Sequence, residues 1–158
     1  MTQPAILFVC LGNICRSPLA EAAFRARAAE AGLDVKVDSA GTGGWHVGEP
    51  PDRRAQATAL RYRIDISRYR GRQVESGDFH RFTHIFALDH DNLVNLRRLA
   101  PADGTAEIGL LLDLVEGLEG EAVADPYYGG ESGFQRTWDQ VDAAARALVA
   151  RLAHERAG

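Results

Sequence analysis

Apolar stretches of two kinds alternate along the chain and predict alternating strands and helices. Residues 5–9 form an unbroken apolar run rich in β-branched and aromatic side chains, which is typical of a strand buried on both faces. A helix is expected next, with Ser17 as its N-cap, Pro18 as its first residue and Gly32 as its C-terminal stop. The other expected strands are 35–37, 83–88 and 106–111, and the other expected helices are 52–62, 91–99 and a last helix that opens at 132.

The last expected helix has an amphipathic pattern. Ser132 followed by Gln135 is a capping-box arrangement. Four apolar residues share one helical face: Val141, Ala145, Leu148 and Leu152. Residues 117–130 before this helix have the weakest pattern and predict a long loop. Strands that alternate with helices predict an α/β fold with a parallel, doubly wound sheet. Because neither a repeat nor a linker-like stretch interrupts the chain, residues 1–158 are expected to form one domain.

Composition and charge exclude several classes of protein. The 158 residues are 46% hydrophobic and 25% charged, as in an ordinary soluble globule, and the formal net charge is −4 without a dense basic stripe. Nucleic acid is therefore not an expected partner. The apolar run at 5–11 is far shorter than the roughly 18 residues needed to cross a bilayer. The N-terminus also lacks the basic region of a secretory signal. A cytoplasmic location with reduced thiols is expected.

The loop after the first strand holds the most informative residues. It runs from Cys10 to Ser17 with the sequence Cys-Leu-Gly-Asn-Ile-Cys-Arg-Ser, between a buried strand and the start of a helix. Ligands of open α/β sheets bind at the carboxyl ends of strands, and the free N–H groups of a helix start attract anions. Gly12 permits a close backbone approach, and Asn13 tolerates left-handed backbone angles, so the loop can curl with its amides inward. This pattern predicts a phosphate site.

Three side chains of this loop are suited to binding a phosphoryl group and attacking it. Arg16 offers a planar pair of donors to two phosphate oxygens. Inward amides, the helix end and Arg16 all favour the thiolate of Cys10, which is then a nucleophile beneath a bound phosphoryl group. Ser17 could donate a hydrogen bond to that sulfur and make it a better leaving group. On the residues alone, the alternative is a buried cysteine followed by a helix-capping serine.

Other binding motifs are absent from the sequence. The chain has no Gly-Lys-Ser/Thr loop, because its single Lys36 follows Val35. In the stretch 41–48, His46 stands where a dinucleotide fingerprint needs its third glycine, and a Gly-x-Ser-x-Gly elbow is missing. The histidines at 80, 84, 90 and 154 are scattered, so they do not complete a four-ligand metal site with the two cysteines. Neither a metal nor a cofactor is expected.

Residues 9–18 resemble the signature of the low-molecular-weight protein tyrosine phosphatases. The segments 38–42, 45–48, 88–89 with 92–93, and 125–129 also resemble family segments in the family order, so the similarity covers nearly the whole chain. The resemblance implies a three-layer α/β fold in which a central four-stranded parallel sheet is flanked by helices. It also implies hydrolysis of phosphotyrosine through a cysteinyl-phosphate intermediate, with phosphotyrosine proteins as substrates and inorganic phosphate as product.

The resemblance implies a role for each matched residue. Cys10 matches the nucleophile, Arg16 the ligand of the phosphoryl oxygens and Asp125 the general acid. The phosphate loop and its supports match Leu11, Gly12, Asn13, Ile14, Cys15, Ser17 and Ser39, and the aromatic walls of the substrate slot match Trp45, Tyr127 and Tyr128. Cys15 also matches the second cysteine, which can form a reversible protective disulfide with Cys10.

The chemistry gives Asp125 a purpose that its local sequence does not. Asp125-Pro126 alone would indicate only a turn. A loop carboxyl can protonate the departing phenolate and then, as a base, activate the water that hydrolyses the cysteinyl phosphate. The chain departs from the family at 69–73, where many eukaryotic members have His-x-Ala-Arg-Gln and this sequence has Tyr-Arg-Gly-Arg-Gln. No secondary role is therefore carried over to Tyr69.

Three other functions fit the same loop. Arginine phosphatases resemble the chain but have Thr in place of Ile14. Thioredoxin-coupled arsenate reductases share the loop but need distant cysteines, of which residues 16–158 contain none. A non-catalytic phosphate- or phosphotyrosine-binding module would not require the nucleophile, the arginine and the acid together. The sequence therefore favours a tyrosine phosphatase.

Overall fold

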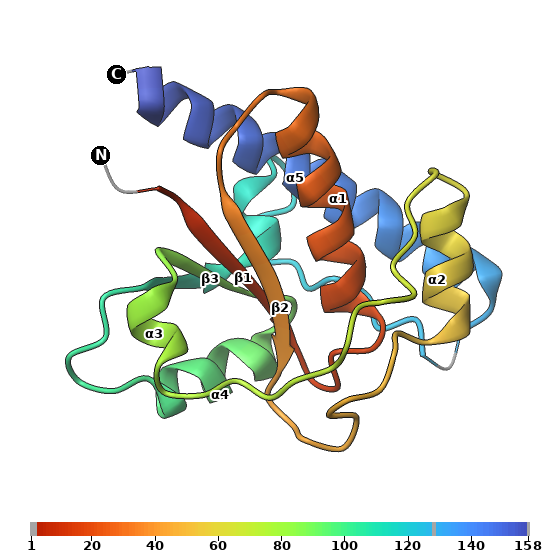
Figure 1. Cartoon of the computed structure of the whole chain (residues 1–158), viewed down its shortest axis with the longest axis horizontal. Helices are drawn as coiled ribbons and strands as arrows, with labels where there is room; N and C mark the ends of the chain where they lie inside the picture. The colour runs from red at the N-terminus through yellow and green to blue at the C-terminus, as the bar shows by residue number, and fades with distance from the viewer. Residues whose placement is uncertain (1–2, 128, 158) are drawn as a thin grey trace.

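A computed structural model describes residues 3–127 and 129–157. At its centre is a four-stranded parallel sheet with the strand order β2, β1, β3, β4 (Figure 1). The strands are β1 (Ala5–Cys10), β2 (Lys36–Gly41), β3 (His84–Ala87) and β4 (Glu107–Leu110). The helices are α1 (Arg16–Glu30), α2 (Arg53–Leu60), α3 (Asp78–Arg81), α4 (His90–Leu99) and α5 (Glu131–Ala157), with a 3-10 helix η1 (Leu111–Leu114) after β4. The expected α/β fold with a four-stranded parallel sheet is confirmed.

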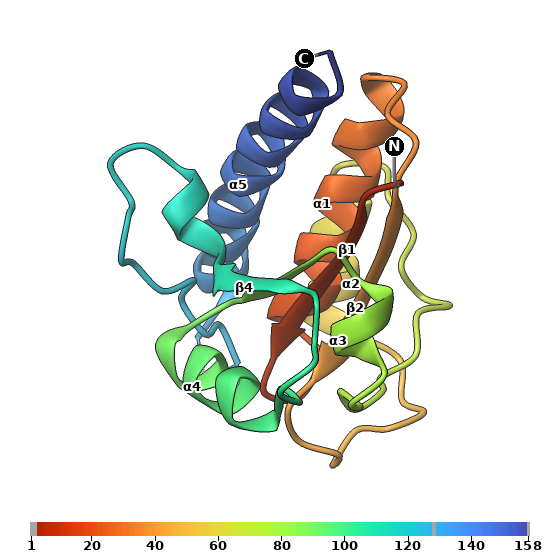
Figure 2. The ribbon, with the colours of Figure 1, turned by 90° about the vertical axis from the view of Figure 1, so that its left-hand side faces the viewer.

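Alternate side chains of β1 point into two separate core layers. Ile6 and Phe8 belong to the layer that contains α1 and α5, whereas Leu7 and Val9 belong to the layer that contains α3 and α4. All six residues of β1 are buried, which explains why the first apolar run shows no alternation with polar residues. Figure 2 shows α1 and α5 on one side of the sheet and α3 and α4 on the other.

The winding of the sheet changes direction at β1. This strand pairs with β2 on one side and with β3 on the other, and the helices that follow β1 and β3 cover opposite faces of the sheet. Such a switch point leaves a crevice beyond the carboxyl ends of the two strands. Cys10 is the last residue of β1, and Asp89 lies two residues after β3. The loop that the sequence singled out therefore opens at this crevice.

The starts of two helices differ from the sequence predictions. The N-cap of α1 is Cys15, which makes no side-chain capping bond, so the prediction of Ser17 as the N-cap is wrong. The Ser17 hydroxyl makes a different bond, which belongs to the site. α5 begins at Glu131, so Ser132 lies inside the first turn and is not the residue before it. The sequence reading also missed α3 and η1, because elements of four residues are too short to show a periodic pattern.

Aspartate side chains cap α2 and α4. Asp52 accepts a hydrogen bond from the Arg54 N–H at the start of α2, and Asp89 accepts one from the Asn92 N–H at the start of α4, both at 2.8 Å. The described residues of 115–130 contain no helix or strand, as the weak pattern there predicts. No helix within residues 3–127 and 129–157 is long and apolar enough to cross a membrane.

Candidate active site

The segment between β1 and α1 folds into a tight loop around the sulfur of Cys10. Asn13 has a φ of 59°, the left-handed conformation expected of it, and its backbone N–H donates to Cys10 Sγ at 3.3 Å. Gly41, at the end of β2, allows the loop to pass close by, because a Cβ at this position would lie 2.8 Å from the Leu11 carbonyl oxygen. The loop can therefore bring a backbone N–H to the sulfur without a clash.

The side chain of Asn13 connects Ser17 to a distant backbone segment. The Arg72 backbone N–H donates to Asn13 Oδ1 at 3.0 Å, so Asn13 Nδ2 faces the other way and donates to Ser17 Oγ at 2.8 Å. Ser17 Oγ also lies 3.0 Å from Cys10 Sγ, and because a thiolate can only accept, the Ser17 hydroxyl is the donor when Cys10 is ionised. The sulfur thus accepts two hydrogen bonds, and both stabilise a thiolate.

The side-chain amide of Asn13 also connects the loop, through Ser39, to the buried carboxyl group of Glu21 on α1. Asn13 Nδ2 also donates to Ser39 Oγ at 3.0 Å, and Ser39 donates to Glu21 Oε1 at 2.8 Å. The other Glu21 oxygen accepts from Arg25 Nε at 2.8 Å. Burial raises the pKa of Glu21, although the bonds from Ser39 and Arg25 oppose the shift. Tyr69 is half-buried next to this pair, and burial raises its pKa to about 12, so it contributes a neutral phenol.

Arg16 is buried, with 4% of its surface exposed, and one of its nitrogens is held by two acceptors. Nη1 donates to Asp89 Oδ2 at 2.7 Å and to the Val123 carbonyl oxygen at 3.2 Å. Burial acts to lower the pKa of Arg16, but the negative charges around it, Cys10 foremost, raise it overall. The Nε–Nη2 edge makes no hydrogen bond with the described residues. That edge can bind two phosphate oxygens side by side.

Asp125 lies at the mouth of the site, in the loop before α5. Its side chain is 53% exposed, and its Oδ2 is 3.8 Å from Arg16 Nη2. The two residues before it are anchored by backbone N–H groups, one to the Leu88 carbonyl oxygen at 2.8 Å and one to the Gln140 side chain at 3.1 Å. These two hydrogen bonds therefore hold the segment that carries the solvent-exposed carboxyl group of Asp125 at the site.

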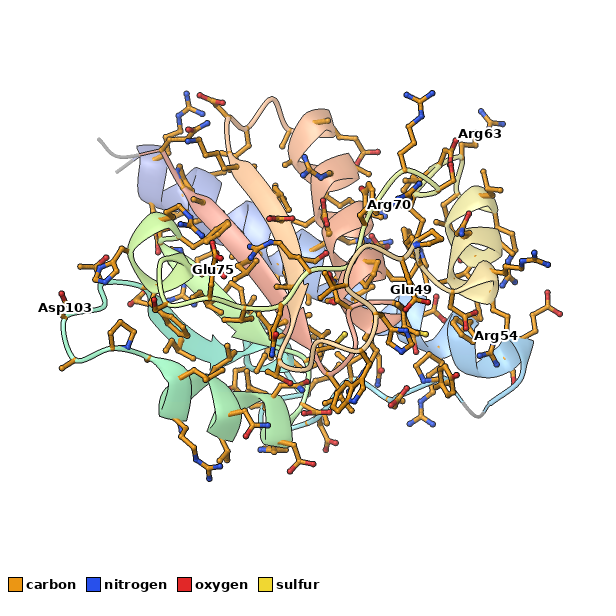
Figure 3. The ribbon with its side chains drawn as sticks, turned by 60° about the horizontal axis from the view of Figure 1, so that its bottom comes forward. Glu49, Arg54, Arg63, Arg70, Glu75 and Asp103 are labelled. Atoms are coloured by element: carbon orange, nitrogen blue, oxygen red, sulfur yellow. The ribbon has the colours of Figure 1, made fainter. Side chains whose placement is uncertain are left out.

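A cavity of about 280 Å³ opens at the sulfur. Its lining residues are Cys10, Leu11, Gly12, Ile14, Cys15, Arg16, Trp45, His46, Asp125 and Tyr127. Trp45 is 71% exposed and Tyr127 40%, so both side chains are accessible at the mouth of the cavity. Figure 3 shows Arg54 reaching from α2 toward the start of α5, and its guanidinium lies over the Tyr127 ring, 5.4 Å from the centroid. Tyr128, expected in the same wall, lies outside the described residues.

Cys15 lines the same cavity as Cys10, and both cysteines are free thiols. Burial raises the pKa of the Cys15 thiol well above its usual range, and the charges of Asp52 and Cys10 add to the shift. A thiol that stays protonated is a weak nucleophile. Cys15 is therefore a poor candidate for the nucleophile of this loop. In the part of the chain that the structure describes, no three His, Cys, Asp or Glu side chains are grouped to hold a metal ion.

The sequence reading assigned no role to three residues of the site. Asp89 accepts a hydrogen bond from Arg16. Its position just after β3, a strand that pairs with β1, is a sequence signal from which its role in the site could have been predicted. Glu21 lies four residues after Ser17, on the same face of α1, but nothing in its neighbourhood marks it as functional. His46 lines the cavity and its Nδ1 is 2.9 Å from Glu49 Oε2. A single histidine in a glycine-rich stretch offers no such signal.

The fold and the site together define a class of protein. A strand-to-helix loop of an α/β sheet holds a hydrogen-bonded cysteine sulfur beside a buried arginine, which is the arrangement of a thiol-dependent phosphatase. The model of the family described as "Low molecular weight phosphotyrosine protein phosphatase" matches residues 5–157. The low molecular weight protein-tyrosine-phosphatase YfkJ of Bacillus subtilis is 42% identical over 154 residues, which cover 96% of this chain and 97% of YfkJ. The chain belongs to the low molecular weight phosphotyrosine protein phosphatase family.

Solved structures agree with this assignment. A protein tyrosine phosphatase from Entamoeba histolytica superposes with a TM-score of 0.91 at 36% identity, covering 98% of this chain and 99% of the other. A Drosophila arginine phosphatase superposes with a TM-score of 0.88 at 34% identity, covering 93% of this chain and 96% of the other. The family and fold expected from the sequence are confirmed. The second of these structures is named as an arginine phosphatase, so proteins with this fold do not all have the same named substrate.

Proposed function

We propose that this chain is a protein-tyrosine phosphatase that hydrolyses phosphotyrosine and other aryl phosphates through a cysteinyl-phosphate intermediate. The observation that carries the proposal is the position of Cys10, whose sulfur lies in the cavity and accepts hydrogen bonds from the Asn13 N–H and the Ser17 hydroxyl. A thiolate held in this way is a nucleophile for a phosphoryl group bound next to it. The names of the relatives support the same reaction.

Binding of the phosphate dianion falls to Arg16 and the start of α1. The Nε–Nη2 edge of Arg16 accommodates two oxygens, and the free N–H groups at the helix start favour negative charge. These groups make the local field positive although the chain has a net charge of −4. Inorganic phosphate, the product, binds the same groups and should act as a competitive inhibitor.

In the first step, the Cys10 thiolate attacks phosphorus. A phosphorus–sulfur bond forms while the bond between phosphorus and the phenol oxygen breaks. The carboxylic acid of Asp125 donates its proton to that oxygen, so a neutral phenol leaves. The exposed position of Asp125 at the mouth of the cavity, where a leaving group would exit, supports this role.

In the second step, a water molecule attacks the phosphorus of the cysteinyl phosphate. The Asp125 carboxylate, left by the first step, accepts a proton from that water. The phosphorus–sulfur bond breaks, and the electron pair returns to Cys10 as a thiolate. The Ser17 hydroxyl and the Asn13 N–H stabilise the leaving sulfur, so the network that supports attack also supports release.

The walls of the cavity favour an aryl substrate. Trp45 and Tyr127 present ring faces against which a phenyl group can stack. Phosphoarginine is the second candidate, because one solved neighbour is named as an arginine phosphatase. Ile14 lines the cavity with an apolar side chain that makes no hydrogen bond to a guanidinium. Arsenate reduction lacks support, because the chain has no cysteine beyond the loop.

Residues 1–158 act as one catalytic domain, supported by a family match that runs from 5 to 157. Phosphotyrosine proteins are the partners. The cytoplasm is the location, because a thiolate nucleophile requires a reducing compartment. The loop disulfide between Cys10 and Cys15 is a protected form of the nucleophile, supported by the place of both thiols in one cavity.

A substrate panel tests the proposal. Phosphotyrosine, phosphoserine, phosphoarginine and arsenate would be assayed with the wild-type protein and with Cys10→Ser. We expect the wild type to hydrolyse phosphotyrosine, also in the presence of a chelator, and Cys10→Ser to show no turnover. The variant should still bind inorganic phosphate, because Arg16 and the loop amides are unchanged. Full activity of Cys10→Ser would contradict the mechanism, and a preference for phosphoarginine would contradict the substrate.

A further inference from the structure

A second hollow lies beside the phosphate cavity and shares two of its walls. Its volume is about 260 Å³, and besides Gly43 it is lined by Leu11, Thr42, Trp45, Asn95, Arg98 and Leu99. Leu11 and Trp45 also line the phosphate cavity, so one ligand can occupy both hollows. Figures 1 and 2 show the reason for this proximity: α4, which carries the last three lining residues, lies next to the carboxyl ends of β1 and β2.

Three large apolar side chains around this hollow face solvent. Leu11 is 47% exposed, Trp45 71% and Leu99 49%. Single exposed apolar residues are ordinary on a protein surface, whereas a group of them around a concave site marks a place where a partner can bury an apolar side chain. The hollow therefore offers apolar contact directly beside the site of chemistry.

Arg98 adds a positive charge at the rim. It is exposed on α4 and makes no hydrogen bond or ion pair with the residues that the structure describes. None of the described lining residues is acidic. By contrast, Arg54 and Arg61, which line another surface hollow, are paired with Asp52 and Glu131. Arg98 is thus free to attract a carboxylate of a ligand.

We propose that this hollow, here named the flank subsite, binds the substrate residues next to the phosphotyrosine. An apolar side chain of the substrate packs on Leu11, Trp45 and Leu99, and a neighbouring Asp or Glu faces Arg98. The inference rests on the proposed phosphatase function. A chain advances at most about 3.6 Å per residue, so only residues close to the phosphotyrosine can reach a hollow that shares walls with the phosphate cavity. The selected substrates are therefore acidic, apolar phosphotyrosine segments.

The test compares Arg98→Glu with Arg97→Glu. Arg97 is a matched control because it is the exposed neighbour on the same helix and does not line the hollow. kcat/KM would be measured for p-nitrophenyl phosphate and for three phosphotyrosine peptides whose flanking pair is Leu-Asp, Gly-Asp or Leu-Lys. The Leu-Lys peptide tests charge, and the Gly-Asp peptide tests apolar contact.

The expected result is a reversal of charge preference. The wild type should prefer the Leu-Asp peptide. Arg98→Glu should lower kcat/KM for this peptide about five-fold, which is the effect expected from losing an exposed ion pair at the strong end of its usual range. The same variant should raise kcat/KM for the Leu-Lys peptide, a gain that partial unfolding does not produce. Arg97→Glu should leave the order of the peptides unchanged, and p-nitrophenyl phosphate, which has no flanking residues, should respond to neither variant. Leu99→Ser should reduce the preference for Leu-Asp over Gly-Asp.

Two outcomes refute the flank subsite while the phosphatase function stands. One is that Arg98→Glu and Arg97→Glu affect the three peptides alike while p-nitrophenyl phosphate is hydrolysed. The other is that Arg98→Glu dissociates a dimer in sedimentation with unchanged peptide kinetics, which would make the hollow an interface between two copies of this chain. If the wild type hydrolyses no substrate, the proposed function fails. The flank subsite is then tested by binding: the affinities of Cys10→Ser for the three labelled phosphopeptides are measured by fluorescence anisotropy, and equal affinities for all three would overturn the subsite.

Discussion

Replacing Ser17 with alanine removes the side-chain hydrogen bond to the nucleophile. It also removes the bond from Asn13 Nδ2, which keeps Ser39 Oγ as its second acceptor. Ser17 Oγ lies 3.0 Å from Cys10 Sγ and is fully buried, and its hydroxyl is the donor when the sulfur is a thiolate, which can only accept. The bond is strongest when the sulfur carries full negative charge, in the free enzyme and after release of phosphate. In the cysteinyl phosphate the sulfur is bonded to phosphorus and carries little charge. The loss should therefore slow the breakdown of the intermediate.

The size of the effect follows from the charge on the sulfur. A hydrogen bond to a charged group contributes about 1.5–3 kcal/mol. If roughly half of the charge has returned to sulfur in the transition state of the second step, the barrier rises by about 0.8–1.5 kcal/mol, which is a fall of about 4- to 13-fold in kcat. A fall far above this range would indicate a collapsed loop.

Stopped-flow hydrolysis of p-nitrophenyl phosphate separates the two steps. We expect Ser17→Ala to release p-nitrophenolate in a burst equal to the enzyme concentration, followed by a slower steady state than that of the wild type. Ser76→Ala, a serine with an exposed side chain outside the site, is the matched control and should match the wild type. Thermal unfolding of both variants checks the fold. An unchanged kcat, or a burst that slows as much as the steady state, would refute the role of Ser17 as a support for the leaving sulfur.

Three more perturbations test other parts of the structure. Asp125→Asn should reduce kcat about 10²- to 10⁴-fold for phenyl phosphate, and much less for substrates whose leaving phenol has a low pKa, which a leaving-group series would measure. Peroxide should inactivate the wild type reversibly, because it oxidises the Cys10 thiolate to a sulfenic acid that the Cys15 thiol converts to a disulfide with loss of water; in Cys15→Ala, thiol should restore less activity. Asp142 accepts two hydrogen bonds of 2.8 Å from Arg27, and although burial acts to raise the pKa of Asp142, Arg27 lowers it below its unfolded value. The stability that this pair contributes is therefore present above the unfolded pKa and is lost as the pH falls through the folded one, so Asp142→Asn should cost about 1 kcal/mol in urea unfolding at pH 7 and less near pH 3. An equal cost at both pH values would contradict this account.

Part of the site could be predicted from the sequence because it is contiguous. Cys10 to Ser17 lie within one loop, so a strand pattern before it and a helix pattern after it were enough to predict a phosphate site. The sequence predicted two roles for Ser17. The role as N-cap is wrong, because α1 already begins at Arg16, whereas the hydroxyl does lie 3.0 Å from the Cys10 sulfur. Asp125 was named through family resemblance, since Asp-Pro alone indicates only a turn.

The sequence by itself determined the alternation of elements, the parallel α/β sheet and the loop chemistry, because periodicity and capping act over a few residues. Only the tertiary structure decided which distant groups complete the site. Arg16 is held by Asp89 and by the Val123 carbonyl oxygen, 73 and 107 residues away in sequence, and Asn13 is oriented by the Arg72 N–H 59 residues away. Such bonds depend on which loops lie together at the carboxyl edge of the sheet. The spacing of residues along the chain does not predict this, because it reflects only local structure.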